Sequence, residues 1–214
     1  MAKRPYTQRL RAQTAEENRQ RILDALYERL REAPAQPVSV DEVAQRAGVA
    51  RSTIYLVFGS RSGLFDALTD HLLSGAGYHQ ILEAVRHPDA RESLRGALAG
   101  GVEMYAAHHD VLRILGSMAK LDPDGVGQAI ARAENERSRG VARQAARLHE
   151  QETLRPGLTV ERATTVIWLL AGFDAYDALA SGQGLSPEEI ANVLVDVAES
   201  ALLVDQNASR RGSP

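Results

Sequence analysis

The apolar residues of the 214-residue chain recur at helical spacing along nearly its whole length, and strand-like alternation is absent. Capping patterns, in which a side-chain oxygen is followed three residues later by an acid, occur at Thr14, Ser39, Asp89 and Ser186, with Pro and Gly between the segments. The sequence therefore predicts an all-α protein of about nine helices. We expect them over residues 15–32, 40–47, 51–57, 61–74, 89–108, 110–120, 126–152, 159–181 and 187–205.

Composition narrows the function classes. The chain has no cysteine, which excludes disulfides, thiolate catalysis and cysteine-ligated metal sites. Hydrophobic residues make up 44% and charged residues 25%, as in ordinary globular proteins of one or two domains. No apolar run resembles a signal peptide, and none reaches the roughly 18 residues of a membrane span. We therefore expect a cytoplasmic protein.

Charge is distributed unevenly along the sequence. Residues 1–64 hold 11 basic and 7 acidic side chains, whereas residues 65–214 hold 14 basic and 21 acidic ones. A basic first part on an acidic remainder suggests a polyanionic partner for the first part. Arg outnumbers Lys by 23 to 2, but this bias also runs through the acidic part, so a GC-rich genome explains it better than nucleic-acid contacts do.

The most informative segment spans residues 38–65. Its first predicted helix, 40–47, is too short to be stable alone, and its apolar residues fall on one face. Gly48 follows, at a position where a tight turn favours a residue that adopts positive φ. Ile54 and Phe58 are four residues apart and indicate the face of the next helix that packs against the same core. The pattern predicts two short helices joined by a small turn, with four polar residues exposed on the second: Arg51, Ser52, Thr53 and Tyr55.

These exposed side chains suit double-stranded DNA. A helix fits the major groove, where an Arg such as Arg51 can pair with guanine O6 and N7, and short hydroxyls can contact a base or a phosphate. Arg61 lies at the predicted start of the following helix, where backbone N–H groups favour an anion. The alternative is an ordinary helical hairpin whose charged side chains are merely solvated.

The pattern A-x-R-A-G-V-A-R-S-T-I-Y-x-x-F-x-S-R-x-x-L resembles the DNA-binding signature of TetR-type (tetracycline-repressor-like) transcriptional regulators, and the likeness covers residues 15–68. It implies a three-helix helix-turn-helix DNA-binding domain over 15–60 and a helical ligand-binding and dimerisation domain over 61–206. DNA-contacting candidates are Ser39, Arg51, Ser52, Thr53, Tyr55, Leu56 and Arg61.

The segment departs from the family pattern at five positions. Ala50 stands where the family has a capping Ser or Thr, which predicts slight fraying of the second helix. Leu56 and Val57 replace aromatic or His residues, and Leu56 could contact a thymine methyl group instead. Arg61 replaces a Lys, and Gly63 should loosen the first turn of its helix.

We expect two flexible ends, over residues 1–14 and 207–214. The first is basic and could place Lys3 and Arg4, with Arg9 and Arg11, in the minor groove beside the recognition helix. A disordered, solubilising segment would explain the same composition.

The resemblance implies that the remaining helices enclose a small-molecule site and form a two-fold dimer. The segment 166–173 is apolar on all sides, and the last helix carries a long apolar stripe, so two helices from each subunit could form a four-helix interface. Burial within the monomer's own core remains the alternative. The dimer candidates are Val166, Leu170, Val193, Val197 and Ala201.

The candidates for a ligand site are large or adaptable residues on inward faces, although core packing would explain each of them singly. They are Met104, Tyr105, His108, Met118, Trp168, Phe173 and Tyr176. The adjacent His108 and His109 point about a quarter-turn apart and do not converge on one ion, so we expect no metal and no cofactor.

No phosphate loop, dinucleotide fingerprint, H-E-x-x-H or G-x-S-x-G motif is present, so we do not expect an enzyme. A helical protein-interaction module would not explain the basic first part and the recognition helix together. The sequence therefore predicts a homodimeric, ligand-responsive transcriptional regulator. We expect a repressor, released by a small molecule from a pseudo-palindromic operator, although the sequence does not separate repressor from activator.

Overall fold

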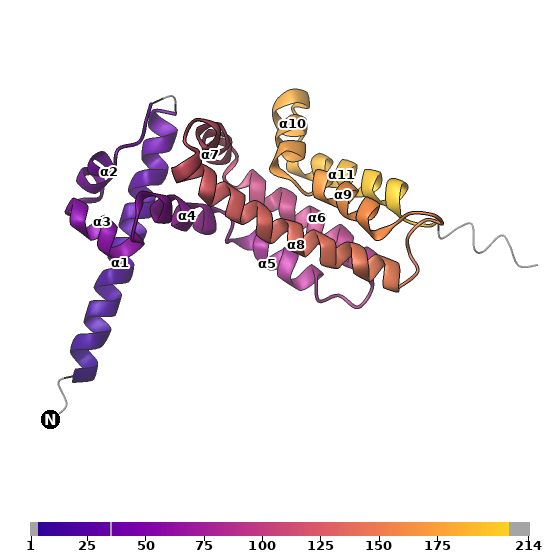
Figure 1. Cartoon of the computed structure of the whole chain (residues 1–214), viewed down its shortest axis with the longest axis horizontal. Helices are drawn as coiled ribbons and strands as arrows, with labels where there is room; N and C mark the ends of the chain where they lie inside the picture. Colours follow the sequence, from indigo (N-terminus) through magenta and orange to yellow (C-terminus); the bar gives the residue numbers. More distant parts are fainter. Residues whose placement is uncertain (1–3, 35, 206–214) are drawn as a thin grey trace, which may run out of the picture. The chain divides into compact units, whose positions relative to one another are not determined.

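The computed structural model describes residues 4–34 and 36–205, and this part of the chain is built almost entirely of helices (Figure 1). It contains eleven α-helices and one π-helical turn, η1. Their bounds are α1 Arg4–Glu32, α2 Val40–Ala47, α3 Arg51–Phe58, α4 Arg61–Leu72, α5 Ala76–Ala84, α6 Ala90–Ala106, α7 His109–Leu121, η1 Pro123–Gly127, α8 Gln128–Glu150, α9 Val160–Leu170, α10 Phe173–Gln183 and α11 Pro187–Leu202. The all-α prediction is confirmed, and no helix among these residues is long and apolar enough to cross a membrane.

The predicted flexible basic segment is wrong from Arg4 onward, because α1 begins there. Residues 7–13 contain Gln, Arg, Leu and Ala and no helix breaker, so extending a helix that is already anchored costs little. Thr14 consequently lies inside α1 rather than at its start. Lys3 and the predicted tail over residues 207–214 lie outside the described residues.

Helix α5 was not predicted, because Gly75, Gly77 and Pro88 suggested a loop. Gly77 instead marks a close approach of two helices: a Cβ atom there would lie 2.5 Å from the Gly100 carbonyl oxygen of α6. Gly96 serves the same purpose, since its Cβ would lie 2.7 Å from that of Ala84. Glycine therefore permits α5 to pack along α6, as Figure 1 shows.

The single helix predicted over 159–181 is two helices, α9 and α10, separated at Ala171 and Gly172. The break frees the carbonyl of Ala171, and the hydroxyl of Tyr105 donates a hydrogen bond to it at 3.1 Å. A long-range contact thus replaces the helical hydrogen bond that the sequence pattern suggested.

Helix contacts divide the chain into two compact units. The first runs up to His71 and takes in Asp110–Arg132, so it holds α1–α4, α7 and η1. The second holds Leu72–His109 and the residues from Ala133 onward, which include α5, α6, α9, α10 and α11.

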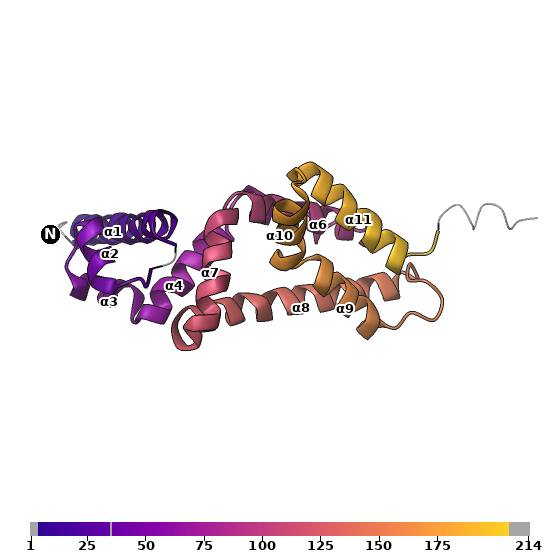
Figure 2. The same cartoon turned by 90° about the horizontal axis from the view of Figure 1, so that it is seen from above.

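The second unit packs α11 against α6 and α9, and Figure 2 shows α10 and α11 beside α6. Its core combines the inward faces of α6, α8, α9 and α11. A short antiparallel bridge between Leu154 and Leu203 fastens the α8–α9 loop to the end of α11.

The first unit has a core that joins all four N-terminal helices. Ile22, Leu26, Ile54, Phe65 and Leu68 are each almost completely buried in it. Because α2 and α3 have only eight residues each, their stability comes from this packing rather than from intrinsic helix formation.

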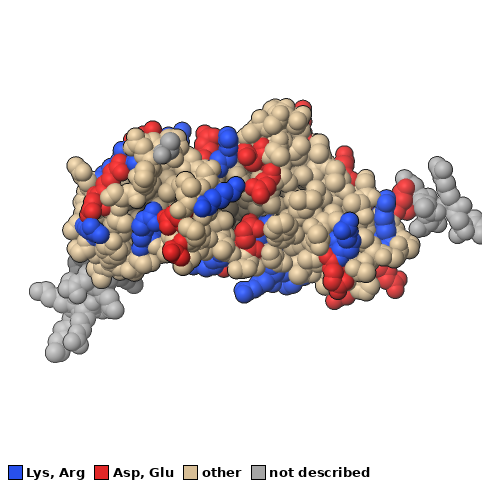
Figure 3. Space-filling view, turned by 45° about the horizontal axis from the view of Figure 1, so that its top comes forward, with Lys and Arg blue, Asp and Glu red and all other residues tan. Residues whose placement is uncertain are grey.

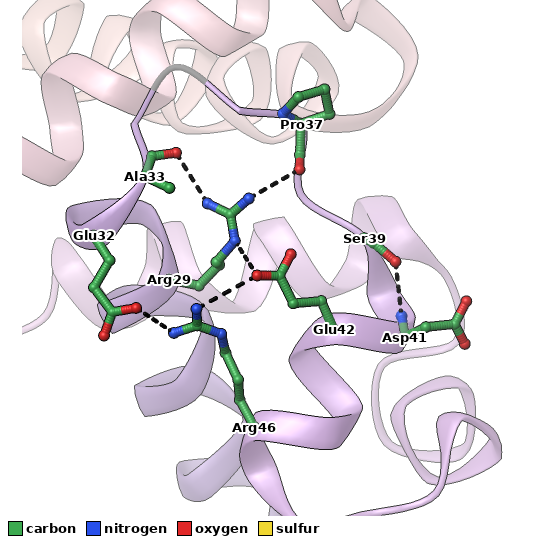
Figure 4. A network of polar contacts seen from close by, with 8 residues as sticks. All are labelled: Arg29, Glu32, Ala33, Pro37, Ser39, Asp41, Glu42 and Arg46. Carbon is green, nitrogen blue, oxygen red and sulfur yellow. Dashed lines mark hydrogen bonds and ion pairs between the residues drawn. The ribbon is translucent and has the colours of Figure 1, made fainter.

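A buried arginine completes the packing of α1 against α2 (Figure 4). Arg29 is 2% exposed, and its Nε donates to Glu42 of α2 at 2.5 Å. Its two terminal nitrogens donate to the carbonyls of Ala33 and Pro37 at 2.9 and 3.2 Å, so one guanidinium joins α1, the connecting loop and α2. Arg46 extends the network by pairing with both Glu32 and Glu42.

Replacing Arg29 by Met should open α2 locally, because two loop carbonyls and Glu42 then lose their buried donor. Glu42 is partly exposed and keeps Arg46, so we expect the free energy of opening to fall by about 2–3 kcal/mol. Hydrogen–deuterium exchange of the α2 amides measures this directly. The control is Arg31→Met, an exposed arginine two residues further along α1; equal exchange in the two variants would contradict the role of Arg29.

Candidate nucleic-acid interface

The α2–turn–α3 segment has the geometry that its sequence predicts. Ser39 caps α2 and accepts a hydrogen bond from the Asp41 backbone N–H at 3.2 Å. Gly48 adopts a left-handed conformation with φ of 64°, and the N–H of Val49 donates to the Ala44 carbonyl at 3.0 Å. Ala50 provides no side-chain cap for α3, which leaves that helix dependent on the burial of Ile54.

The opposite face of α3 is exposed. Arg51, Ser52, Tyr55 and Leu56 are all exposed, and Thr53 is half-buried. Leu56 is 86% exposed, which leaves its apolar side chain free to contact a partner such as a thymine methyl group. The predicted exposure is confirmed for Arg51, Ser52 and Tyr55, whereas Thr53 is less exposed than predicted.

Arg51 has two intramolecular partners. Its Nη1 donates to the Asp41 carboxylate at 2.8 Å, and its Nη2 donates to the Tyr55 hydroxyl at 3.3 Å. Its guanidinium carbon lies 5.6 Å from the centroid of the Tyr55 ring. The hydrogen bond with Tyr55, followed by the charge of Asp41, raises the pKa of Arg51 further, so the side chain stays cationic.

Arg61, which we expected to face an anion at the start of α4, forms an ion pair with Asp122 at the end of α7. It also lies over the Phe65 ring, 5.0 Å from the centroid. The hydrogen bond that Arg61 donates is the main cause of the lowered pKa of Asp122. The N–H of Gly125 donates a further hydrogen bond to the Asp122 carboxylate at 3.0 Å. The sequence gave no signal for this contact, because the partners are 61 residues apart.

A second cluster lies in the other unit, where α6, α10 and His109, the last residue of the segment Leu72–His109, bring aromatic side chains together. Tyr105 meets Phe173 edge-on at 5.5 Å between ring centroids, and Tyr176 at 6.0 Å. His109 lies 5.3 Å from Tyr176, and its Nε2 is 2.6 Å from the Asp177 carboxylate, to which the Ser181 hydroxyl also donates.

Burial raises the pKa of Tyr105 to about 12 and also raises that of Tyr176, so both phenols remain neutral hydrogen-bonding groups.

Three of the predicted ligand-site residues thus lie together, namely Tyr105, Phe173 and Tyr176. His109, which is adjacent to the predicted His108, contacts both Phe173 and Tyr176. Trp168 has a separate partner, because Arg137 lies 4.8 Å from its ring centroid and donates to its carbonyl. Met104 is half-buried on α6, and Met118 belongs to the other unit.

Apolar side chains are also exposed on α9 and α11. Trp168 and Leu169 on α9 are 43% and 62% exposed, and Val193 and Val197 on α11 are 39% and 45% exposed. The buried residues of α11 include Ile190, Leu194 and Ala198, and the helix packs against α6 and α9. Of the other dimer candidates, Ala201 is exposed, whereas Val166 and Leu170 are half-buried.

Charges of both signs alternate over the face shown in Figure 3, and no broad patch of one sign covers it. Several charged side chains of the described residues form ion pairs within their own unit, such as Arg95 with Glu92 and Arg132 with Asp70. The uneven charge along the sequence therefore does not translate into one basic surface on this face.

The exposed, partly cationic face of α3, held by α2 and a glycine turn, defines a helix-turn-helix DNA-binding domain. Residues 22–68 match the family described as bacterial regulatory proteins of the tetR family. Residues 22–68 therefore carry the DNA-binding domain of TetR-family transcriptional regulators, a family that is not enzymatic.

Solved structures share the fold. NalD, the secondary repressor of the MexAB-OprM multidrug efflux pump in Pseudomonas aeruginosa, is 21% identical, with a TM-score of 0.70 over 90% of this chain and 99% of that one. The ketosteroid regulator KstR2 of Mycobacterium tuberculosis is 17% identical, with a TM-score of 0.63 over 87% and 95%. The fatty acid degradation regulator FadR from Bacillus halodurans is 16% identical, with a TM-score of 0.66 over 84% and 93%. No curated protein matches the chain.

Replacing Arg51 by Ala should reduce affinity for the preferred DNA sequence roughly 5- to 150-fold and relax the preference at one base pair, as expected for an arginine bound to guanine. Binding titrations on a preferred and an unrelated duplex measure both effects. Replacing Arg61 by Ala should weaken binding to both duplexes alike, as expected for a phosphate contact. Equal weakening by Arg51→Ala would contradict its assignment to a base.

Proposed function

We propose that the protein is a homodimeric repressor that leaves a pseudo-palindromic operator when a small molecule binds to its second unit. The observation that carries this proposal is the partly polar aromatic cluster of Tyr105, His109, Phe173, Tyr176 and Asp177. Sites for small molecules combine apolar walls with a few placed polar groups, and this cluster has that composition. NalD is described as a repressor, KstR2 as a ketosteroid transcriptional regulator and FadR as a fatty acid degradation regulator, and these descriptions support a repressor that responds to a small organic molecule.

The domain assignment remains part of the proposal. Residues 15–60 would contact DNA, and residues 61–206 would provide effector binding and dimerisation. Ser39, Ser52, Thr53, Tyr55, Leu56 and the helical Arg4 would contact DNA beside Arg51 and Arg61.

Helix α4 is the element through which the effector would act. Besides the Arg61–Asp122 pair, Arg132 at the beginning of α8 contacts both Asp66 and Asp70 of α4 at 3.3 Å. Helix α8 continues from these contacts into the second unit. Effector binding can shift the protein only if the effector has a higher affinity for the form that does not fit the operator.

The effector proposal predicts that one compound changes both stability and DNA binding. In a thermal-shift screen of the full-length protein, a true effector at a hundredfold excess over its Kd should stabilise the protein by about 2.7 kcal/mol. The same compound should lower affinity for a duplex selected from a random pool. Phe173→Ala should abolish both effects and keep DNA binding, whereas Val85→Ala, at an exposed position outside both the cluster and the proposed dimer interface, should retain them.

A compound that raises the melting temperature and leaves DNA affinity unchanged would overturn its role as an effector. If Phe173→Ala responds like the native protein, the effector site lies elsewhere.

The dimer proposal depends on the exposed apolar side chains of α9 and α11. Val193 and Val197 are one helical turn apart, and together with Trp168 and Leu169 they would form a two-fold interface of four helices. Two subunits would then present two α3 helices to half-sites one or more helical turns apart on the DNA.

Val197→Glu should convert the dimer into monomers, because the new carboxylate would be buried without a partner in the interface. Analytical ultracentrifugation measures the change. The control is Asn192→Glu, which introduces the same charge at an exposed position on another side of α11. A dimeric Val197→Glu variant, or a native protein that is monomeric at micromolar concentration, would contradict this interface.

A further inference from the structure

Asp41 and Arg51 connect the first turns of α2 and α3 on the exposed side of the DNA-binding domain. The 2.8 Å ion pair between them and the 3.3 Å bond from Arg51 to Tyr55 hold the guanidinium from two sides. Two of its five N–H groups are used in this way, and the remaining three suffice for one bidentate pair with guanine. Asp41 was not among the residues that the sequence singled out for DNA contact.

The Asp41–Arg51 pair contributes little to the fold. The side chains of Asp41 and Arg51 are 63% and 56% exposed, and exposed ion pairs of this kind have little effect on stability. Glu42, one residue away, takes the structural role instead, because it binds the buried Arg29. Figure 4 shows the Asp41 carboxylate turned away from that network, with only its backbone N–H bonded to Ser39.

A carboxylate on a surface that meets DNA is unfavourable for affinity, because it repels phosphates. It accepts hydrogen bonds but donates none, so among base edges it suits only amino groups such as cytosine N4. Asp41 is therefore best explained by a gain in discrimination that offsets its cost in affinity.

We propose that Asp41 is a positioning residue for sequence recognition: it orients Arg51 toward a guanine and weakens binding to DNA of any other sequence. This inference rests on the proposed operator-binding function. At the correct base pair, Arg51 finds its two acceptors in the orientation that Asp41 imposes. At an incorrect base pair, Arg51 lacks these two acceptors, and the negative charge of Asp41 still repels the DNA phosphates.

The test uses the full-length protein and a pool of duplexes with a randomised stretch long enough for two half-sites. Sequencing the bound fraction gives the base preference at each position. Labelled duplexes of the selected sequence, of versions with single base pairs changed, and of unrelated sequence then give affinities over a range of salt concentrations.

Asp41→Asn keeps the shape of the side chain and removes its charge. We expect the preference at the guanine that Arg51 contacts to fall about fivefold or more. Binding to the unrelated duplex should become roughly three- to tenfold tighter, with a steeper salt dependence, because one repulsive charge is lost. Asp41→Glu, which keeps the charge and changes the reach, should lower the preference and leave binding to the unrelated duplex weak.

Glu32→Gln is the matched control. It removes one exposed carboxylate from the same domain, and its partner is Arg46 rather than Arg51. This variant should keep the native guanine preference. In an Arg51→Ala background, Asp41→Asn should not change base preference any further, since Asp41 acts through Arg51.

A native preference profile in Asp41→Asn would overturn the role of Asp41 and leave the proposed function intact. An equal loss of affinity on all duplexes would also overturn it, because that is the signature of damage to the fold. A native protein that selects no sequence from the pool would refute the proposed function and this inference together.

Discussion

The buried guanidinium of Arg29 is the interaction on which the DNA-binding domain depends. It satisfies two loop carbonyls and a carboxylate at the point where α1 ends and α2 begins, and so fixes α2 on α1. The Gly48 turn and the burial of Ile54 then determine where α3 lies. Because α3 lacks a side-chain cap, the exposed recognition face has no rigidity of its own and takes it from this core.

Helix α4 connects that core to the rest of the first unit through charge pairs rather than apolar packing alone. Arg61 contacts Asp122, while Asp66 and Asp70 contact Arg132. Partly exposed ion pairs are weak and exchange partners readily, in contrast to a close-packed core, which resists displacement. These ion pairs can rearrange at low free-energy cost while Phe65 and Leu68 of α4 stay buried, which is what the proposed alternation between two DNA affinities requires.

The sequence predicted the DNA-binding segment well because its signals are local. Ser39 and Gly48 mark the two ends of α2. The apolar spacing of Val43, Ala47 and Ile54 indicates which faces of α2 and α3 are buried. The contacts of Arg61 and His109 could not be predicted, because their partners Asp122 and Asp177 are more than sixty residues away. Helix α5 was missed for the same reason, since the meaning of Gly77 depends on Gly100 of another helix.

Arg29 could have been recognised, because it lies at helical spacing from Ile22 and Leu26 on the buried side of α1. A charged residue on such a face needs a partner of opposite charge. Glu42, in the first turn of the next helix, supplies that partner for Arg29. The opposite error concerns residues 4–13, where basic composition suggested flexibility although every residue favours or tolerates a helix.

The side chains that we assign to DNA contact and to the dimer interface contribute least to the fold. Leu56, the Asp41–Arg51 pair and the valines of α11 are exposed, and the free chain would gain solubility if they were replaced by neutral polar residues. Arg29, Ile54 and Tyr105, by contrast, are buried and have their intramolecular partners. Exposed apolar and paired charged residues at such positions would be explained by the partners that we propose, DNA on α3 and a second subunit on α11.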